Sequence, residues 1–233
     1  MMRSALLRAS AAASACAALS MMAACGSDDS GAPFSPAPAA APGSGEVVRD
    51  PAQLAAGLLA ADDLPGDFAV VPPRTGPDAP PVPPIALTEP ADCARLLTPI
   101  AQQWPGSAAA ASVQFAGPSY ATIDIDAASY PDTALAAAFD ALQAQPRRCT
   151  TYSGDDAGVR IDYRAEDLSQ PPAGDASSAF LLTASSDGLT LTSATALVQV
   201  GNTLVQVTVT APEAVDPGVL TDLTAAQVRK LRA

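Results

Sequence analysis

The chain has 233 residues, of which 12 are basic and 24 acidic, with 23 prolines, four cysteines and no histidine. The net charge of −12 argues against binding to nucleic acid, because phosphate backbones are bound by clustered Lys and Arg. The absence of histidine excludes Ser-His-Asp and Cys-His catalysis and disfavours a zinc site, so we expect neither a metal nor a cofactor.

The first 24 residues have the pattern of a lipoprotein signal peptide. Arg3 and Arg8 precede an uncharged, alanine-rich run over 9–24, which is shorter than the roughly 20 apolar residues that a membrane span needs. The run ends in "MAAC", which resembles a bacterial lipobox, whose cysteine receives a diacylglyceryl group. We therefore expect cleavage before Cys25 and lipidation of Cys25. The alternative is an ordinary signal peptide with an incidental cysteine.

A segment rich in Pro, Ala, Gly and Ser follows over 26–45 and predicts a partly extended tether, about 60 Å long at roughly 3.1 Å per residue. Removing 1–24 takes away two of the 12 basic residues and none of the 24 acidic ones, which changes the formal charge from −12 to −14. The expected organisation is a signal peptide over 1–24, a lipidated cysteine and tether over 25–45, and a single domain over 46–233. Because two acyl chains anchor a protein stably, we expect the domain at the outer face of the cell membrane.

Two helices are predicted at the start of the domain. The first begins at Pro51 with Asp50 as its N-cap and ends at Pro65-Gly66. A proline-rich loop follows over 71–84. The second helix spans 90–103, begins after Thr88 or Glu89, and turns three apolar side chains inward: Leu96, Leu97 and Ile100.

Two strands and a longer helix come next. Strands are predicted over 112–117 and 121–128. In the second strand Ile123 and Ile125 alternate with Asp124 and Asp126, which leaves one face of the strand exposed to solvent. The helix runs from 130 to Pro146, which stops it, and has an apolar face formed by Leu135, Phe139 and Leu142.

The last part of the chain is rich in strands. An alternating pattern predicts a strand over 158–167, and 178–185 is included in the β-rich part without such a pattern. The pair Gly201-Asn202 predicts a two-residue hairpin turn between strands over 189–200 and 203–211. A terminal helix begins after Asp216. These elements predict an α+β domain, an antiparallel β-sheet with helices packed on one face.

Two cysteines, Cys93 and Cys149, remain once Cys16 is removed with the signal peptide and Cys25 carries lipid. In an oxidising compartment two such cysteines most often pair, and a loop of about 57 residues would contribute about 4 kcal/mol to stability. The alternative is a reactive thiol pair, but such pairs usually lie close together as Cys-x-x-Cys. We therefore expect one structural disulfide.

The order of these features resembles a known family. A helix carrying "ADCARLL", the strand "TIDIDA", the helix "PDTALAAAFDALQ" followed by "RRC", the strand "VRIDYRAED", the hairpin and the terminal helix look like the extracellular sensor domain of the mycobacterial Ser/Thr kinase PknH, a domain also found on actinobacterial lipoproteins. The resemblance covers about 50–233 and implies a sheet with helices around a cleft for an unknown ligand. Cys93 and Cys149 match the first disulfide of that family, whereas its second, around the late hairpin, is missing because Thr190 and Thr210 stand there. We find neither a kinase domain nor a transmembrane helix, so we do not expect this chain to signal across the membrane by itself.

Candidate residues for chemistry are few. The carboxylate pairs Asp62-Asp63 and Asp155-Asp156 suit acid–base catalysis or calcium binding, but adjacent residues point apart, which favours solvated surface roles. Five aromatic residues are candidates for a ligand cleft or, alternatively, for the core: Trp104, Tyr120, Tyr130, Tyr152 and Tyr163. The prediction is a non-catalytic, sensor-like domain for an unknown envelope ligand or protein partner. The alternative is an envelope hydrolase that uses carboxylates alone, such as a glycosidase, which an aromatic content of 4% disfavours.

Overall fold

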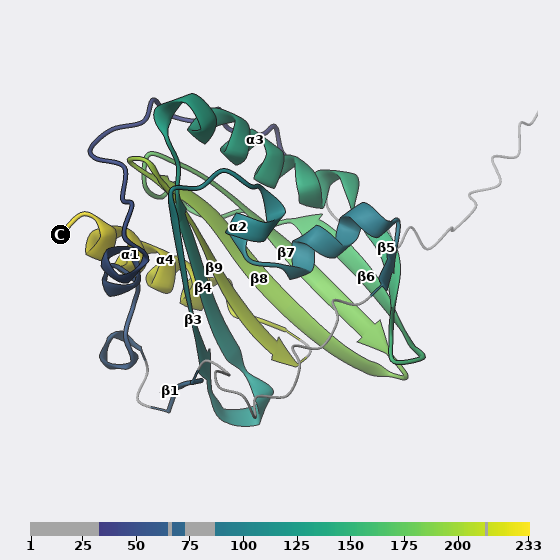
Figure 1. The fold of residues 1–233 in the computed structure, drawn as a ribbon. Helices are drawn as coiled ribbons and strands as arrows, with labels where there is room; N and C mark the ends of the chain where they lie inside the picture. Colours follow the sequence, from purple (N-terminus) through teal and green to yellow (C-terminus); the bar gives the residue numbers. More distant parts are fainter. Residues whose placement is uncertain (1–32, 65–66, 73–86, 213) are drawn as a thin grey trace, which may run out of the picture. The chain divides into compact units, whose positions relative to one another are not determined.

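A computed structural model describes residues 33–64, 67–72, 87–212 and 214–233. The expected signal peptide, Cys25 and most of the proline-rich loop lie outside these residues. The centre of the domain is a nine-stranded antiparallel sheet with strand order β1-β3-β4-β9-β8-β7-β6-β5-β2 (Figure 1).

The strands are β1 (Ala69–Val70), β2 (Leu87–Glu89), β3 (Ala109–Ala116), β4 (Thr122–Ser129), β5 (Thr151–Asp156), β6 (Val159–Asp167), β7 (Ala176–Ser186), β8 (Leu189–Val200) and β9 (Thr203–Pro212). The α-helices are α1 (Pro51–Ala56), α2 (Ile100–Gln103), α3 (Asp132–Arg148) and α4 (Pro217–Leu231). Three short 3₁₀ segments complete the fold: η1 (Ala61–Asp63), η2 (Ala91–Leu97) and η3 (Pro118–Tyr120).

Helices pack on both faces of the sheet (Figure 1). One face, with Ile123, Ile125 and Val205, packs against α1 and α4, and the other, with Leu197 and Leu204, packs against α2 and α3. The α+β class, the antiparallel sheet and the single disulfide are confirmed, whereas the expected restriction of the helices to one face is wrong. The reason lies in β8 and β9, where neighbouring residues are both apolar. Leu204 and Val205 are each fully buried although they point to opposite faces.

Local signals in the sequence are largely confirmed. The side chains of Asp50 and Asp216 accept hydrogen bonds from the first turns of α1 and α4, at 2.9 Å and 2.8 Å. Gly201 has a φ of +58° in the two-residue turn between β8 and β9, which suits the first central position of a type II′ turn. Pro146 does not stop α3. It lies in the last turn, where one hydrogen bond is lost, and the helix continues to Arg148.

The helix predicted over 90–103 is instead two short pieces, η2 and α2. Thr98 separates them in an extended conformation because it precedes Pro99, and a residue before proline avoids the helical region. As a result Leu97 is 37% exposed rather than inward, while Leu96 and Ile100 are buried as expected. The first helix is also shorter than predicted and ends at Ala56, with Gly57 as its C-cap.

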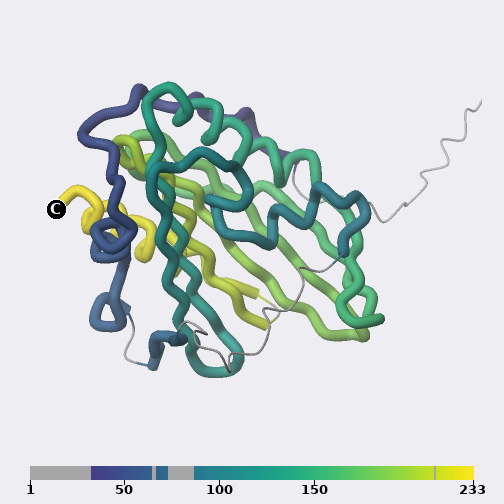
Figure 2. Tube along the Cα trace, in the orientation of Figure 1, coloured from purple at the N-terminus to yellow at the C-terminus, as the bar shows by residue number. Residues whose placement is uncertain are grey.

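Residues 33–45, which we call the strap, lie against the domain (Figure 2), whereas the composition predicts only a partly extended tether. The amide of Gln199 on β8 bonds both backbone groups of Ala41, at 2.9 Å each, and Gln143 on α3 donates to the carbonyl of Pro38 at 3.0 Å. Arg147 donates to the carbonyl of Ser35. These contacts hold the strap because buried side-chain amides need partners, and the backbone of the strap supplies them.

Candidate functional site

A cleft of about 670 Å³ lies on the face of the sheet that carries α2 and α3. The helices cover this face around Leu197 and Leu204 and leave the part toward the β7–β8 turn open. The floor is polar and comes from β3, β4, β8 and β9: Ser112, Gln114, Asp124, Asp126, Ser193, Thr195, Gln206 and Thr208. The rim is mainly apolar and includes Val70, Val71, Leu96, Leu97, Pro99 and Phe180. A cavity of this volume has the size of a small-molecule site.

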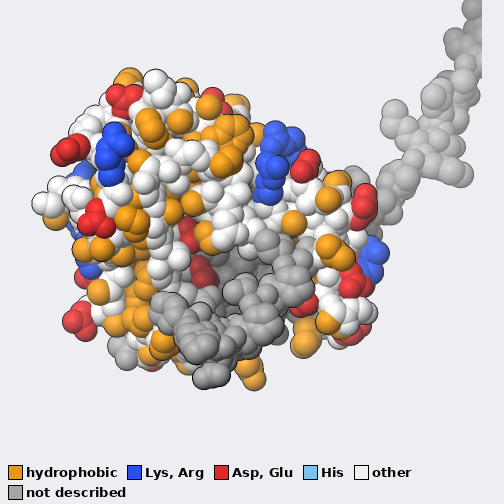
Figure 3. Space-filling view, viewed as in Figure 1, with side chains coloured by type: hydrophobic (Ala, Val, Ile, Leu, Met, Phe, Trp, Pro, Cys, Tyr) orange, Lys and Arg blue, Asp and Glu red, His pale blue; other side chains and the backbone are white. Residues whose placement is uncertain are grey.

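The polar floor follows from strand alternation and register. Asp126 on β4 lies opposite Ser112 on β3 and Gln206 on β9, and Asp124 lies opposite Gln114 and Thr208. Since residues directly opposite in a sheet point to the same face, these side chains meet in the cleft. Figure 3 shows acidic side chains inside a hollow of the surface on this side of the molecule.

Two carboxylates on this floor differ in their surroundings. Asp124 accepts hydrogen bonds from Gln114 at 2.6 Å and Thr122 at 3.0 Å, which limit the rise in its pKa that burial produces. No described residue donates a hydrogen bond to Asp126. Burial, and then the neighbouring Asp124 carboxylate, raise the pKa of Asp126 to about 7. The cleft therefore contains a carboxyl group whose charge changes near neutral pH.

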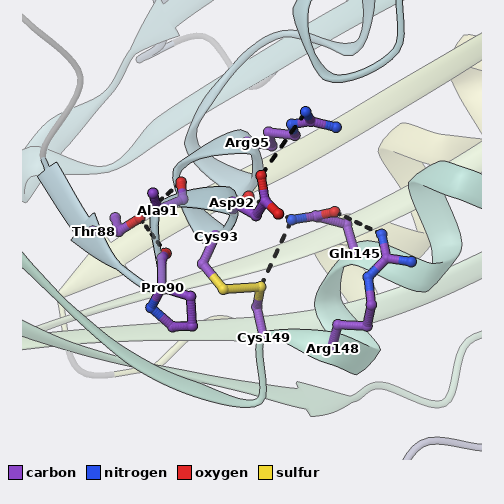
Figure 4. Close-up of a disulfide and its surroundings, with 9 residues drawn as sticks. All are labelled: Thr88, Pro90, Ala91, Asp92, Cys93, Arg95, Gln145, Arg148 and Cys149. Atoms are coloured by element: carbon purple, nitrogen blue, oxygen red, sulfur yellow. Dashed lines mark hydrogen bonds and ion pairs between the residues drawn. A yellow bond between two sulfur atoms is a disulfide. The ribbon is translucent and has the colours of Figure 1, made fainter.

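The disulfide between Cys93 and Cys149 holds one rim of the cleft in place (Figure 4). It links η2 to the C-cap of α3 with a Cα–Cα distance of 5.7 Å, and both cysteines are buried. Gln145 reaches from α3 and donates to the carbonyl of Asp92 at 2.6 Å. Because the two cysteines are bonded to each other and buried, the bridge has a structural role rather than that of a reactive thiol pair. Since η2 supplies Leu96 and Leu97 to the rim, the bridge also fixes this part of the cleft.

The acidic pairs singled out in the sequence lie outside the cleft. Asp63 forms an ion pair with Lys230 at 2.5 Å, and the hydrogen bond from Lys230 lowers the pKa of Asp63. Asp155 accepts a hydrogen bond from the backbone of Gly158 at 2.9 Å and stabilises the β5–β6 turn. Asp62 and Asp156 are exposed neighbours of these two. Both pairs therefore have the surface and turn roles that were weighed against catalysis.

The five aromatic candidates are not gathered at the cleft either. Tyr130 is fully buried and donates to the carbonyl of Trp104 at 2.8 Å, in the core beneath α2 and α3. Tyr152 and Tyr163 stack with ring centroids 4.6 Å apart in the cluster around the disulfide. Tyr120 is 87% exposed in η3. The core interpretation thus applies to four of the five.

The sequence contains a further signal for the cleft, beyond the solvent-exposed face that Asp124 and Asp126 give to one strand. The same alternation of apolar and polar residues occurs in "VQVTVT" at 205–210, with Gln206 and Thr208 on the polar side. Two strands with this pattern can build one polar surface when they pair, as β4 and β9 do.

Two features are absent from the described residues. No group of three or more Cys, Asp or Glu side chains there is arranged to hold a metal ion. None of the helices described is long and apolar enough to cross a membrane.

No protein-family model and no curated protein matches this chain. Among solved structures, the extracellular domain of PknH from Mycobacterium tuberculosis is similar with a TM-score of 0.59 at 16% sequence identity, over 79% of this chain and 98% of that one. The chain has the fold of the PknH extracellular domain. A putative uncharacterized protein from Mycobacterium smegmatis matches 78% of this chain and 95% of its own at 18% identity, with a TM-score of 0.42.

The PknH-like fold confirms the resemblance expected from the order of elements. At the places where that resemblance implies a second disulfide, hydroxyl pairs connect the strands of this chain. Thr210 lies 2.8 Å from the hydroxyl of Ser193, and Thr190 lies 3.3 Å from that of Ser185. The late strands are therefore joined, by one pair on each face of the sheet, through hydrogen bonds between side chains rather than by a covalent link.

Proposed function

We propose that this chain is a lipoprotein of the cell envelope, anchored through Cys25 at the outer face of the cell membrane, whose domain binds a ligand in the cleft without turning it over. The signal and lipobox pattern over 1–25 supports the anchor. The PknH-like fold supports a sensor-like role outside the cytoplasm, since the similar structure is an extracellular domain.

The observation that carries the binding function is the cleft itself. Its floor offers hydroxyl, amide and carboxylate groups from four strands, and its rim offers apolar surface. Such a site suits a guest with several hydrogen-bonding groups on one side and an apolar edge on the other. Asp124 and Asp126, together with a mature charge of −14 that follows from removing Arg3 and Arg8, favour a neutral or cationic guest over an anionic one.

A carboxylate hydrolase is the second candidate, because the cleft contains two carboxyl groups of unequal pKa, the usual requirement for acid–base hydrolysis. The geometry favours binding. Glycosidases place their two acids on either side of the scissile bond, whereas Asp124 and Asp126 project from the same face of one strand. Both therefore lie on the same side of any guest.

The test uses three sugars of one ring type that differ in charge: glucosamine, N-acetylglucosamine and glucuronic acid. We expect thermal stabilisation to be largest with glucosamine and absent with glucuronic acid, and Asp126→Asn to remove the preference for the amine. A ligand at one hundred times its Kd stabilises by about 2.7 kcal/mol, which a melting curve resolves.

A glycoside hydrolysis screen of the same preparation separates the two candidates. We expect no turnover. Hydrolysis that Asp124→Asn or Asp126→Asn abolishes would overturn the binding function in favour of the hydrolase.

A further inference from the structure

A second cavity, of about 270 Å³, lies at the strand ends where β6 stops and the chain crosses to β7. Its walls come from the strap, the loop over 168–173, β7, β8, α4 and Arg147 of α3. It shares no lining residue with the cleft. We call it the α4 slot.

The hydroxyl of Thr224 is a buried polar group of the α4 slot without a partner. Thr224, in the middle of α4, lines the slot, is only 5% exposed, and its hydroxyl makes no hydrogen bond. A threonine inside a helix usually points to solvent or bonds back to the carbonyl four residues earlier. Thr221, one turn before it, does so with Pro217 at 3.0 Å and also donates to Gln170 at 2.5 Å. A buried hydroxyl without a partner is costly, so Thr224 marks a place where a guest can supply one.

Several other polar groups that line the α4 slot have partners within the protein. Ser177 accepts from the backbone of Ala173 at 2.9 Å, and Ser35 donates to Asp167 at 2.6 Å. The guanidinium of Arg147 donates to the strap and lies 5.1 Å from the ring centroid of Phe34, although its Nε has no partner. Between these groups the walls are apolar, with Leu168, Pro171, Ala179, Ala196, Val198 and Ala225.

We propose that the α4 slot is a second binding site, and that it takes a small neutral molecule with an apolar body and one hydroxyl or carbonyl group. The apolar walls bind the body, and the hydroxyl of Thr224 bonds the polar group. The volume is adequate, because a dry apolar cavity of about 150 Å³ already holds benzene. Such a guest also touches Ser35 and Pro36, so the site is built partly by the strap.

The test compares benzyl alcohol with toluene, which differ by one hydroxyl group, in NMR titrations of the full-length chain. We expect benzyl alcohol to shift signals of Leu168, Ala196 and Thr224, and to leave Asp126 and Thr208 of the cleft unchanged. Thr224→Val, which keeps the shape of the side chain and removes the hydroxyl, should weaken the binding of benzyl alcohol about three- to tenfold and leave the binding of toluene unchanged. Thr221→Val is the matched control, because its hydroxyl is already bonded within the protein, and it should not alter the preference between the probes.

Melting of the free variants is an independent measurement. If the hydroxyl of Thr224 is unpaired in the empty protein, Thr224→Val should raise the melting temperature, because it removes a buried polar group without a partner. A lower melting temperature would show that buried water already satisfies the hydroxyl and would overturn the proposal. So would equal affinity of Thr224→Val and wild type for benzyl alcohol, or shifts confined to the cleft.

Discussion

Asp124 and Asp126 lie two residues apart on β4, and this spacing turns both carboxyl groups into the cleft. Their environments then raise the pKa values of the two carboxyl groups to different extents. Hydrogen bonds from Gln114 and Thr122 stabilise the charged form of Asp124, while Asp126 loses solvation through burial and is repelled by the charge of its neighbour. Ionisation of Asp126 is therefore unfavourable in the folded protein, and a cationic guest would relieve this penalty.

Asp126→Asn should stabilise the protein in a pH-dependent way. The pKa of Asp126 is about 7 in the folded chain and near 3.8 in the unfolded chain, so the folded state binds the extra proton between these values. The stability of the wild type consequently falls as pH rises from about 4 to 7, whereas asparagine does not titrate. We expect the melting temperatures to differ little at pH 4 and to diverge up to about pH 8, with the variant higher.

The matched control is Asp140→Asn, at an exposed position on α3. The melting temperature of Asp140→Asn should differ from that of the wild type by a small amount that stays constant over the same pH range. If the difference in melting temperature between Asp126→Asn and the wild type were also independent of pH, it would contradict the unfavourable ionisation of Asp126 in the cleft.

At the scale of elements, the strap is held by contacts between residues far apart in the chain. Gln199 is fully buried, and its amide pairs with Ala41, 158 residues away, as a neighbouring strand would. Gln199→Ala should remove these bonds and cost about 1–3 kcal/mol in the free energy of unfolding. Hydrogen exchange at the amide of Ala41 should become faster, while Gln102→Ala, an exposed glutamine on α2, should leave it unchanged. Slow exchange at Ala41 in Gln199→Ala would show that other contacts hold the strap.

The difference between local and distant contacts explains how much the sequence could predict. Asp50, Asp216 and Gly201-Asn202 act on neighbours within a few residues, and the elements that they begin or connect were found. The strap was missed because its partners lie on β8 and α3. The family resemblance implies a cleft, but its residues are not predicted, because the floor joins β3 and β4 to β8 and β9, an order that only the folded sheet establishes.

The disulfide joins the end of α3 to η2, which forms part of the rim of the cleft. Replacing both Cys93 and Cys149 with alanine opens a loop with a sequence separation of 56 residues, which should lower the free energy of unfolding by about 4 kcal/mol. Because η2 forms part of the rim, we also expect weaker binding of glucosamine by the folded fraction. Urea unfolding with and without glucosamine measures both effects. An unchanged urea midpoint would contradict the structural role of the bridge.

For the whole molecule, the strap changes the distance at which an anchored domain would lie from its lipid. With 33–45 bound to the domain, only residues 26–32 separate Cys25 from the strap. At 3.3–3.6 Å per extended residue these reach about 25 Å at most, against about 60 Å for the whole segment over 26–45. An anchor at Cys25 would thus keep the domain close to the membrane.

The anchor itself gives the last prediction. Cys25→Ala should move the protein from the membrane fraction to the medium or the soluble fraction, because a chain without the acyl groups lacks the hydrophobic area that stable anchoring requires. Cys16→Ala is the matched control, since this cysteine lies in the same alanine-rich run but precedes the expected cleavage point, so its fractionation should match wild type. Incorporation of labelled palmitate should likewise be lost in the first variant and kept in the second. If Cys25→Ala stays in the membrane fraction, the protein is held there by something other than a lipid on Cys25, and the short reach calculated from the strap no longer applies.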